Sequence, residues 1–203
     1  MQSLVKACAQ PNFPAEIVSV LSNNLEAAGL KFAADHAIAT QVIDHRDYAT
    51  RDEFDAKITD YLEKMDVDLI CLAGFMRLLT ENFVNRWRDR ILNIHPSLLP
   101  AFKGLHVHER AIESGTRFTG CTVHFVRPEM DDGPIIAQAA VPIHSDDTAD
   151  VLAARILEQE HRIYPLALKL VAEGRVKIMG SIAKIDGAEL QDRSLLNPKP
   201  EDH

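Results

Sequence analysis

The sequence predicts an α/β protein with an open, doubly wound sheet that is mostly parallel and has one antiparallel strand. Short runs rich in β-branched residues alternate with longer amphipathic runs, as in right-handed βαβ crossovers. The segment 67–73 is nearly all apolar, which is typical of a central parallel strand that is covered on both faces. Two late strands are joined by a turn-rich segment too short for a helical crossover, so they are expected to be antiparallel.

The first half of the chain contains the alternating elements. In the segment 51–64 the apolar residues Phe54, Ile58 and Leu62 recur at helical spacing on one face. Short runs of β-branched residues indicate strands. In chain order we expect a helix at 2–9, a strand at 15–21, a helix at 25–37, a strand at 40–43, a helix at 51–64, a strand at 67–73, a helix at 81–87 and a strand at 90–95.

In the second half of the chain, helices and strands no longer alternate regularly. Strands are expected at 118–125 and 135–141, with the turn residues 127–134 between them. A long helix follows, with N-cap candidates at 145–148 and an end at Gly174. We expect a loop around 104–117 and loose polar chain from Lys184 onward. The predicted domains are a single domain over 1–190 and a polar C-terminal tail over 191–203.

Composition excludes several classes of protein. The 203 residues contain 22 basic and 30 acidic side chains, a net charge of −8, which argues against a nucleic-acid partner held through phosphates. No apolar run approaches the length of a membrane span, and the N-terminus has no signal-peptide pattern. We therefore expect a cytoplasmic protein with no membrane partner. The odd, widely spaced Cys8, Cys71 and Cys121 indicate reduced thiols rather than disulfides.

A pair of polar residues stands at the end of the strand predicted at 90–95. Asn93 and His95 are two residues apart, so both side chains point to the same face, and Pro96 ends the strand. Ligands of open α/β sheets bind at the carboxyl ends of strands. An amide and a protonated imidazole there can stabilise an oxyanion. A buried asparagine beside a structural histidine explains the pair equally well.

A carboxylate near that histidine strengthens the chemical interpretation. The segment 130–133 lies between the late strands, and Gly133 suggests a tight turn that brings Asp131 over the strand ends. A neighbouring carboxylate favours the imidazolium form of histidine, which a proton donor needs. An Asp-Asp-Gly sequence is also an ordinary turn, so this alternative stays open.

Metal binding is a further alternative. His106 and His108 form a His-x-His pair, and His95 and His124 can complete a three-histidine zinc site. No His-Glu-x-x-His or Cys-x-x-Cys motif supports such a site, and we predict no metal.

Two further segments each allow two interpretations. The segment 74–79 is either a pocket for a flat ring or a strand-to-helix corner. The segment 159–161 is either a binding segment or a solvated helix face.

Several motifs occur together in the order and spacing of one enzyme family, the folate-dependent phosphoribosylglycinamide formyltransferases, and the chain resembles this family from residue 1 to about 190. The motifs are Ala-Gly-Phe-Met-Arg-Leu-Leu at 73–79, Asn-Ile-His-Pro-Ser-Leu-Leu-Pro at 93–100, Gly-Leu-His-Val-His at 104–108, Met-Asp-Asp-Gly-Pro at 130–134 and Gln-Glu-His-Arg-Ile-Tyr-Pro at 159–165. The element at 93–100 is shared by the wider formyltransferase superfamily, whereas those at 104–108 and 159–165 narrow the resemblance.

The resemblance implies a formyltransferase fold and transfer of a formyl group from 10-formyltetrahydrofolate, as co-substrate, to the amine of glycinamide ribonucleotide in purine biosynthesis. It implies three catalytic residues, Asn93, His95 and Asp131, no metal, small-molecule substrates only, and a monomer or homodimer. The implied folate-binding residues are Arg51, Met76, Arg77, Leu78, Leu79, Asn93, Arg127, Pro128, Glu129, Met130 and Asp131. The implied glycinamide-ribonucleotide-binding residues are Gln159 and Glu160.

The sequence departs from the family at its beginning. The family has a strand and a Gly-Ser-Asn phosphate loop before the helix expected at 2–9, whereas the first glycine here is Gly29. We expect the first strand to be missing from this chain, through a mis-assigned start or in a naturally shortened relative. Two alternative functions remain: a formyltetrahydrofolate hydrolase that passes the formyl group to water, and a truncated, non-catalytic folate-binding relative.

Overall fold

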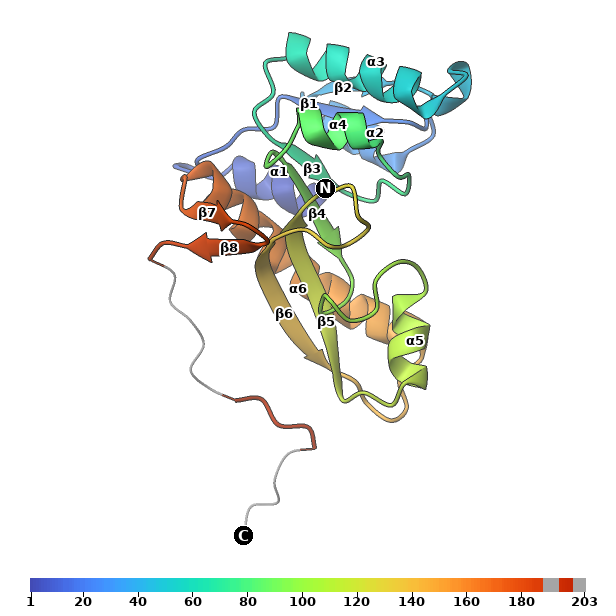
Figure 1. Ribbon diagram of the computed structural model, residues 1–203, viewed down its shortest axis with the longest axis vertical. Coiled ribbons are helices and arrows are strands. Elements are labelled where there is room, and N and C mark those ends of the chain that lie inside the picture. The colour runs from blue at the N-terminus through green and yellow to red at the C-terminus, as the bar shows by residue number, and fades with distance from the viewer. Residues whose placement is uncertain (188–193, 199–203) are drawn as a thin grey trace. The chain divides into compact units, whose positions relative to one another are not determined.

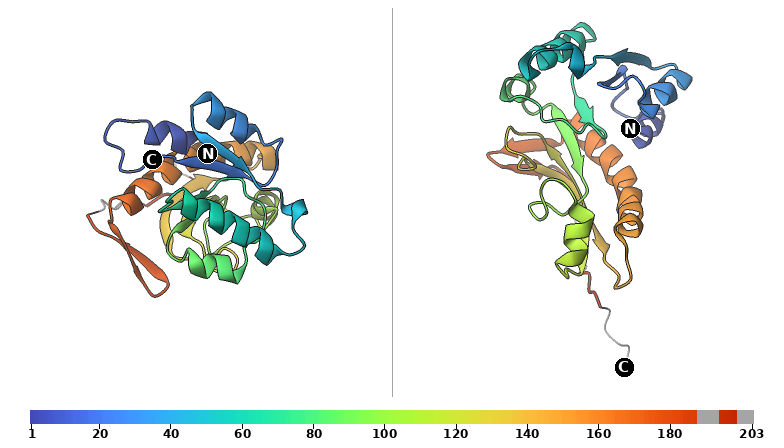
Figure 2. Two further views of the ribbon diagram at one scale, coloured as in Figure 1. Left: turned by 90° about the horizontal axis from the view of Figure 1, so that it is seen from above. Right: turned by 90° about the vertical axis from the view of Figure 1, so that its right-hand side faces the viewer.

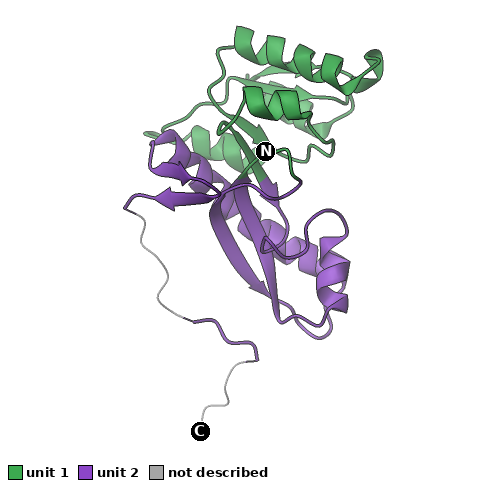
Figure 3. Ribbon diagram, viewed as in Figure 1, with its two compact units in different colours: residues 1–93, 125–129 green, residues 94–124, 130–203 purple. Residues whose placement is uncertain are grey.

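The computed structural model of the protein describes residues 1–187 and 194–198 and divides the chain into two compact units (Figure 3). The first unit contains residues 1–93 and 125–129, and the second contains 94–124 and 130–203. The expected tail at 191–203 lies outside the described residues except for 194–198. The expected single domain over 1–190 stays a prediction.

The first unit follows the predicted alternation of helices and strands. Its elements are α1 (Gln2–Cys8), β1 (Ser19–Ser22), α2 (Ala28–Asp35), β2 (Ala39–Val42), the 3-10 helix η1 (His45–Asp47), α3 (Arg51–Lys64), β3 (Ile70–Leu72), α4 (Glu81–Arg86) and the start of β4 (Ile91–His95) (Figure 1). The chain leaves this unit within β4, after Asn93.

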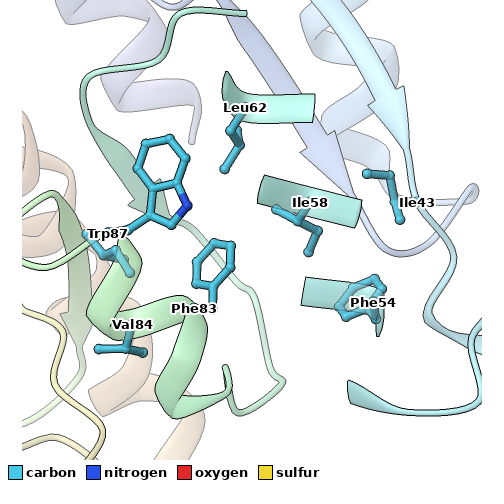
Figure 4. Close-up of a cluster of buried hydrophobic side chains, with 8 residues drawn as sticks. Ile43, Phe54, Ile58, Leu62, Phe83, Val84 and Trp87 are labelled. Atoms are coloured by element: carbon cyan, nitrogen blue, oxygen red, sulfur yellow. The ribbon is translucent and has the colours of Figure 1, made fainter. Parts of the chain in front are cut away.

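Helices α3 and α4 begin with threonine caps and are joined by their apolar faces. Thr50 and Glu53 form a reciprocal capping box at the start of α3, and the Thr80 hydroxyl accepts from the Phe83 amide at the start of α4. The Asp55 carboxylate of α3 accepts a hydrogen bond of 2.7 Å from the Thr80 amide. Buried side chains of both helices form a common core with Ile43, with Trp87 at the end of α4 and with Ile91 of β4 (Figure 4): Ile43, Phe54, Ile58, Leu62, Phe83, Val84, Trp87 and Ile91.

The strands of the first unit pair in parallel, as predicted. β1 pairs with β2 in a two-stranded sheet of its own, with Ser19 opposite Ala39. β3 pairs with β4, with Ile70 opposite Ile91. β3 is shorter than the strand expected at 67–73, and its residues are half-buried, so the prediction that it is covered on both faces was wrong.

The second unit contains the predicted antiparallel pair and a long helix. Its elements are α5 (Val107–Glu113), β5 (Phe118–Phe125), β6 (Ile135–Pro142), α6 (Ala149–Ala172), β7 (Val176–Met179) and β8 (Ile182–Ile185) (Figures 1 and 2). β5 and β6 are antiparallel, with Phe118 opposite Pro142. A Cβ at Gly120 would lie 1.8 Å from the Ala139 carbonyl oxygen, so only glycine permits this close approach of the two strands.

Helix α6 lies against β6 and α5. The Thr148 hydroxyl caps its N-terminus by accepting from the Val151 amide, as expected for one of the residues at 145–148. The helix then continues through Pro165 to Ala172. Within the described residues, no helix is both long and apolar enough to span a membrane.

Two local predictions were wrong. The segment 104–117 is not only a loop, because Val107 and Ala111 are one helical turn apart and are buried together on α5. Lys184 does not begin a loose tail: it lies in β8, whose antiparallel partner β7 was also not predicted. A two-residue connection at 180–181 joins these strands, and the alternation at 176–179 is the pattern of a half-buried strand. The α/β class with both parallel and antiparallel strands is confirmed.

Candidate active site

The end of β4 carries the polar pair that the sequence indicates. Asn93 lies opposite Leu72 of β3, and His95 is the last residue of the strand. Asn93 is half-buried, and His95 is only 6% exposed. Because side chains two apart on a strand share a face, the predicted placement of this pair at a strand end holds.

The imidazole of His95 has an acceptor at each of its nitrogens. Nε2 lies 2.9 Å from the carbonyl oxygen of Phe102, and Nδ1 lies 3.5 Å from Oδ2 of Asp131. A carbonyl oxygen can only accept, so Nε2 carries a hydrogen. In the neutral ring, Nδ1 would then turn a lone pair toward a carboxylate. Only a doubly protonated ring would present an N–H to both neighbours.

Asp131 reaches His95 through a left-handed backbone. Its φ is +52°, a conformation that aspartate and asparagine adopt more readily than most residues. Oδ2 accepts a hydrogen bond of 2.9 Å from the Gly104 amide, and the side chain is 11% exposed. The predicted turn does bring the carboxylate to His95, but the turn depends on Asp131 itself as well as on the glycine that follows it.

His124 is a third member of this group whose contact with Asp131 was not predicted. It is 2% exposed on β5, and its Nε2 lies 4.0 Å from Oδ1 of Asp131. The sequence suggested His124 only as a possible zinc ligand. The two carboxylate oxygens of Asp131 therefore face two different histidines. Burial in a regular strand is the signal that marks His124, since histidine is rarely so buried without a polar neighbour.

The remaining histidines of the zinc alternative, His106 and His108, do not complete a metal site within the described part of the chain. His106 is exposed, with Nδ1 3.9 Å from Glu109. His108 is half-buried, and burial lowers its pKa, with a smaller lowering by the neighbouring His95 and an opposing effect of Glu109. Within residues 1–187 and 194–198, no cluster of three or more His, Cys, Asp or Glu side chains has the arrangement of a metal site.

The residues expected to bind folate in the first unit form an exposed corner after β3. Met76 is 79% exposed and Leu78 59% exposed, an unusual exposure for large apolar side chains. The Arg77 guanidinium lies 5.7 Å from the centre of the Phe54 ring, whereas Leu79 packs on the core. Arg51 is exposed as the first residue of α3. Apolar surface from Met76 and Leu78 and positive charge from Arg51 and Arg77 thus lie on this corner.

The segment 127–131 contributes fewer free groups than the resemblance implies. Arg127 is bound by its Nη2 to the Asp89 carboxylate at 2.5 Å, and its side chain is nearly buried. Pro128, Glu129 and Met130 are exposed. Arg127 thus orders its end of the segment through an ion pair.

Gln159 and Glu160 lie in the middle of α6. Both side chains are half-buried, whereas the neighbouring His161 is exposed. Burial raises the pKa of Glu160. Burial, with a smaller contribution from Glu160, raises the pKa of the Cys121 thiol to about 12, so this cysteine is not an activated nucleophile. The Gln159 side-chain oxygen accepts from Arg162 at 3.1 Å.

Comparisons with known proteins agree with the resemblance. The family described as formyl transferase matches residues 1–168. The chain belongs to this family. Phosphoribosylglycinamide formyltransferase from Haemophilus influenzae is 43% identical over 197 residues, which are 97% of this chain and 93% of that protein. A solved structure of glycinamide ribonucleotide transformylase 1 from Symbiobacterium toebii is 44% identical with a TM-score of 0.88, covering 91% of this chain and 87% of that one.

Some relatives of this chain are much longer. The trifunctional purine biosynthetic protein adenosine-3 from Gallus gallus is 50% identical over 185 residues, which are 91% of this chain but only 18% of that protein. The chain therefore spans less than a fifth of such a relative. The predicted resemblance to the phosphoribosylglycinamide formyltransferases is confirmed, and all the predicted site residues lie within the matched residues 1–168.

For a formyltransferase, the group around His95 has a definite chemical capacity. Formyl transfer to an amine passes through a tetrahedral oxyanion, which hydrogen-bond donors stabilise. The end of β4 supplies an amide at Asn93 and an imidazole at His95. Asp131 and Phe102 both act on the same ring as acceptors. These two contacts from the second unit thus orient the imidazole.

Proposed function

We propose that this formyltransferase transfers the formyl group of 10-formyltetrahydrofolate to the primary amine of glycinamide ribonucleotide. The observation that carries the proposal is the His95 ring, held between the Phe102 carbonyl and the Asp131 carboxylate at the end of β4. The names of the Haemophilus influenzae and Symbiobacterium toebii relatives support the choice of acceptor. The folate-derived donor follows from the family.

The proposed reaction begins with attack of the amine on the formyl carbon. A carbon–nitrogen bond forms, and the carbonyl oxygen becomes an oxyanion. Nε2 of His95 stays on the Phe102 carbonyl at 2.9 Å, so Nδ1 is the nitrogen available to the substrate. Its 3.5 Å separation from Asp131 is long for a direct hydrogen bond, so we propose that the Nδ1 hydrogen is donated to the oxyanion. The Asn93 amide is proposed as the second donor.

Proton transfers complete the reaction. The attacking nitrogen must lose a proton, and N10 of the folate must gain one when its bond to the formyl carbon breaks. We assign the acceptance of the first proton to Asp131 through water, because its carboxylate stays close to the reacting end of His95. His95 supplies the proton that the leaving nitrogen takes up, and the proton held on Asp131 then passes to His95 through water, which restores both groups. No step requires a covalent intermediate or a metal.

The substrate contacts follow the placement of the remaining predicted residues. The exposed apolar side chains Met76 and Leu78 and the positive Arg51 and Arg77 suit an aromatic, negatively charged folate. The segment 127–131 is proposed to close over the pteridine with its backbone rather than through Arg127, whose guanidinium is bound to Asp89. Gln159 and Glu160 are proposed to bind glycinamide ribonucleotide through its hydroxyls or amine.

A donor-consumption assay tests the proposal directly. The protein is mixed with 10-formyltetrahydrofolate, and release of tetrahydrofolate is followed with and without glycinamide ribonucleotide. We expect release only when the amine is present, with equal amounts of formylated product. Equal release without the amine would instead identify a hydrolase. Binding of the folate without turnover in either mixture would identify a non-catalytic folate-binding protein.

A further inference from the structure

One short loop touches both His95 and Asp131. The Phe102 carbonyl accepts from Nε2 of His95, and the Gly104 amide donates to Oδ2 of Asp131, both at 2.9 Å. The two contacts come from main-chain atoms only two residues apart. The shape of the main chain at 102–105 therefore sets the separation and orientation of the imidazole and the carboxylate.

The Lys103–Gly104 peptide group is bound on both of its sides. Its N–H, from Gly104, donates to Asp131, and its C=O, from Lys103, accepts a hydrogen bond of 2.6 Å from Nη1 of Arg110 on α5. The peptide unit is planar, so rotation about its flanking bonds would break both hydrogen bonds together. A cationic donor on the carbonyl also polarises the peptide and strengthens its N–H as a donor.

Arg110 holds the loop at more than one point. The same Nη1 lies 3.3 Å from the Leu105 carbonyl, and the guanidinium lies 5.7 Å from the centre of the Phe102 ring. Lys103 adds an ion pair with Asp132. Arg110 thus reaches residues on both sides of Gly104 although its own side chain lies on the surface.

The loop needs such support because its local conformation is unfavourable. Phe102 and His106 have φ values of +52° and +56°, in the left-handed region that side chains with a Cβ avoid. Gly104, between them, has a φ of +80°. Non-glycine residues persist in this region when surrounding contacts hold them there. Within the described residues, Arg110 provides the side-chain hydrogen bonds to the carbonyls on both sides of Gly104.

We propose that Arg110 is a positioning residue for formyl transfer: it holds the Lys103–Gly104 peptide so that the Gly104 amide fixes Asp131 against His95. Arg110 does not touch the reacting atoms, and it acts through one peptide group. This inference rests on the proposed function of the His95 and Asp131 pair. It adds a residue that none of the predicted sites contains, on a helix that was not predicted.

The test replaces Arg110 by methionine, which keeps an unbranched stem and removes every donor. In Arg110→Met we expect kcat for formyl transfer to fall about tenfold, with less than a twofold change in KM for either substrate, because a misplaced group costs rate rather than binding. Arg110→Lys keeps a cationic donor and is expected to retain at least a third of kcat. An unchanged kcat in Arg110→Met would overturn the proposal, as would a fall in Arg110→Lys equal to that in Arg110→Met.

A second measurement needs no turnover. The amide proton of Gly104, observed by NMR in the free protein, is expected to move upfield and exchange faster in Arg110→Met, because its peptide loses the charged donor. An unchanged Gly104 amide would overturn the proposal even if kcat fell. A wild-type protein that shows no transfer at all would contradict the proposed function instead, and the Gly104 amide would still report whether Arg110 holds the peptide.

Arg175 offers a matched control. It also donates to two main-chain carbonyls of a turn, those of Asp186 at 2.9 Å and Gly187 at 2.8 Å. Arg175→Met removes the same number and kind of groups from a part of the second unit that has no proposed role in the reaction. We expect its kcat and its Gly104 amide shift to equal those of the wild type. An equal loss of kcat in both arginine variants would assign the effect of Arg110 to general stability and overturn the proposal.

Discussion

The two nitrogens of His95 face different acceptors at different distances, and we propose a different role for each nitrogen. The contact of Nε2 with the Phe102 carbonyl is short and fixes the ring, whereas the contact of Nδ1 with Asp131 is longer and leaves a proton accessible. A neutral amide in place of the imidazole can keep one donor but cannot carry the charge. In the proposed mechanism, a positive charge near the oxyanion is the property that a substitution of His95 removes.

We therefore predict that His95→Asn lowers kcat by about 10²-fold or more, since it removes both the charged donor and the proton. Steady-state formyl transfer near neutral pH measures the effect, and circular dichroism checks the fold. His144→Asn, at an exposed histidine of the same unit, is the control and should leave kcat unchanged. A kcat within threefold of the wild type in His95→Asn would contradict the role of His95.

Asp131 combines a chemical task with a backbone task, and two substitutions separate them. Asp131→Asn removes the charge but tolerates the left-handed conformation at φ +52°, so we expect a large loss of kcat with almost unchanged stability. Asp131→Ala loses both properties and should also lower the free energy of unfolding by about 1 kcal/mol. Urea unfolding and steady-state kinetics measured on both variants test this. Equal stability losses in the two variants would refute the backbone argument.

Individual residues show where prediction from sequence succeeds and where it stops. Asn93 and His95 were predictable because alternation on a strand and a following proline are visible in the sequence. The acceptor from Phe102 was not, because a carbonyl oxygen is present in every residue and its direction depends on φ and ψ. The left-handed conformation at Phe102 and His106 lies at residues that rarely adopt it, so the sequence contains no sign of it.

At the scale of elements, the start of α6 is fixed by an ion pair as well as by its cap. The two terminal guanidinium nitrogens of Arg155, Nη1 and Nη2, donate to the Asp147 carboxylate at 2.6 and 2.7 Å. This bidentate contact lowers the pKa of Asp147 from 3.8 to about 2. The folded state thus holds the proton of Asp147 less tightly than the unfolded chain does, so the pair stabilises the fold only while the carboxylate is ionised.

The resulting prediction concerns acid stability. Asp147→Asn should lower the free energy of unfolding at neutral pH, and its difference from the wild type should shrink as the pH falls from about 4 to about 2. Urea unfolding of both proteins across this range measures the difference. The neighbouring Asp146→Asn is the control, because the Asp146 carboxylate is exposed and forms none of these hydrogen bonds. A difference that stays constant down to pH 2 would contradict the pairing.

The elements also differ in how well the sequence predicts them. Helix α3 carries a regular apolar face and a capping box, and its range 51–64 was predicted to the residue. Helix α5 has only two buried positions in seven residues, too few to show a period. The strand expected at 15–21 is found at Ser19–Ser22, because apolar residues before it continue the pattern without joining the ladder.

At the scale of the whole molecule, the sheets differ in how deeply their strands are buried and in how many residues they pair. β5 is buried along nearly its whole length, and seven of its residues are paired with β6. β1 and β2 pair over four residues, none of them fully buried, in a separate two-stranded sheet. Isolated two-stranded sheets are only marginally stable, so local opening of β1 and β2 should cost less than opening of β5.

Hydrogen exchange tests this hierarchy. We expect the amides of β1 and β2 to exchange at least tenfold faster than those in the centre of β5, under conditions where the fold is intact. The Ile43 amide, which donates to the Ser22 carbonyl at 3.0 Å, is a useful reporter for the smaller sheet. Equal protection of the two sheets would mean that they open only in global unfolding.

The close approach of β5 and β6 at Gly120 has a consequence for mutational screens. Every side chain larger than hydrogen there would collide with the Ala139 carbonyl and push apart the strand that ends near His124. A saturation library scored by growth would therefore rank Gly120 beside His95, although one position fails by steric exclusion and the other by chemistry. Measuring the amount of folded protein for each variant would separate the two kinds of intolerance.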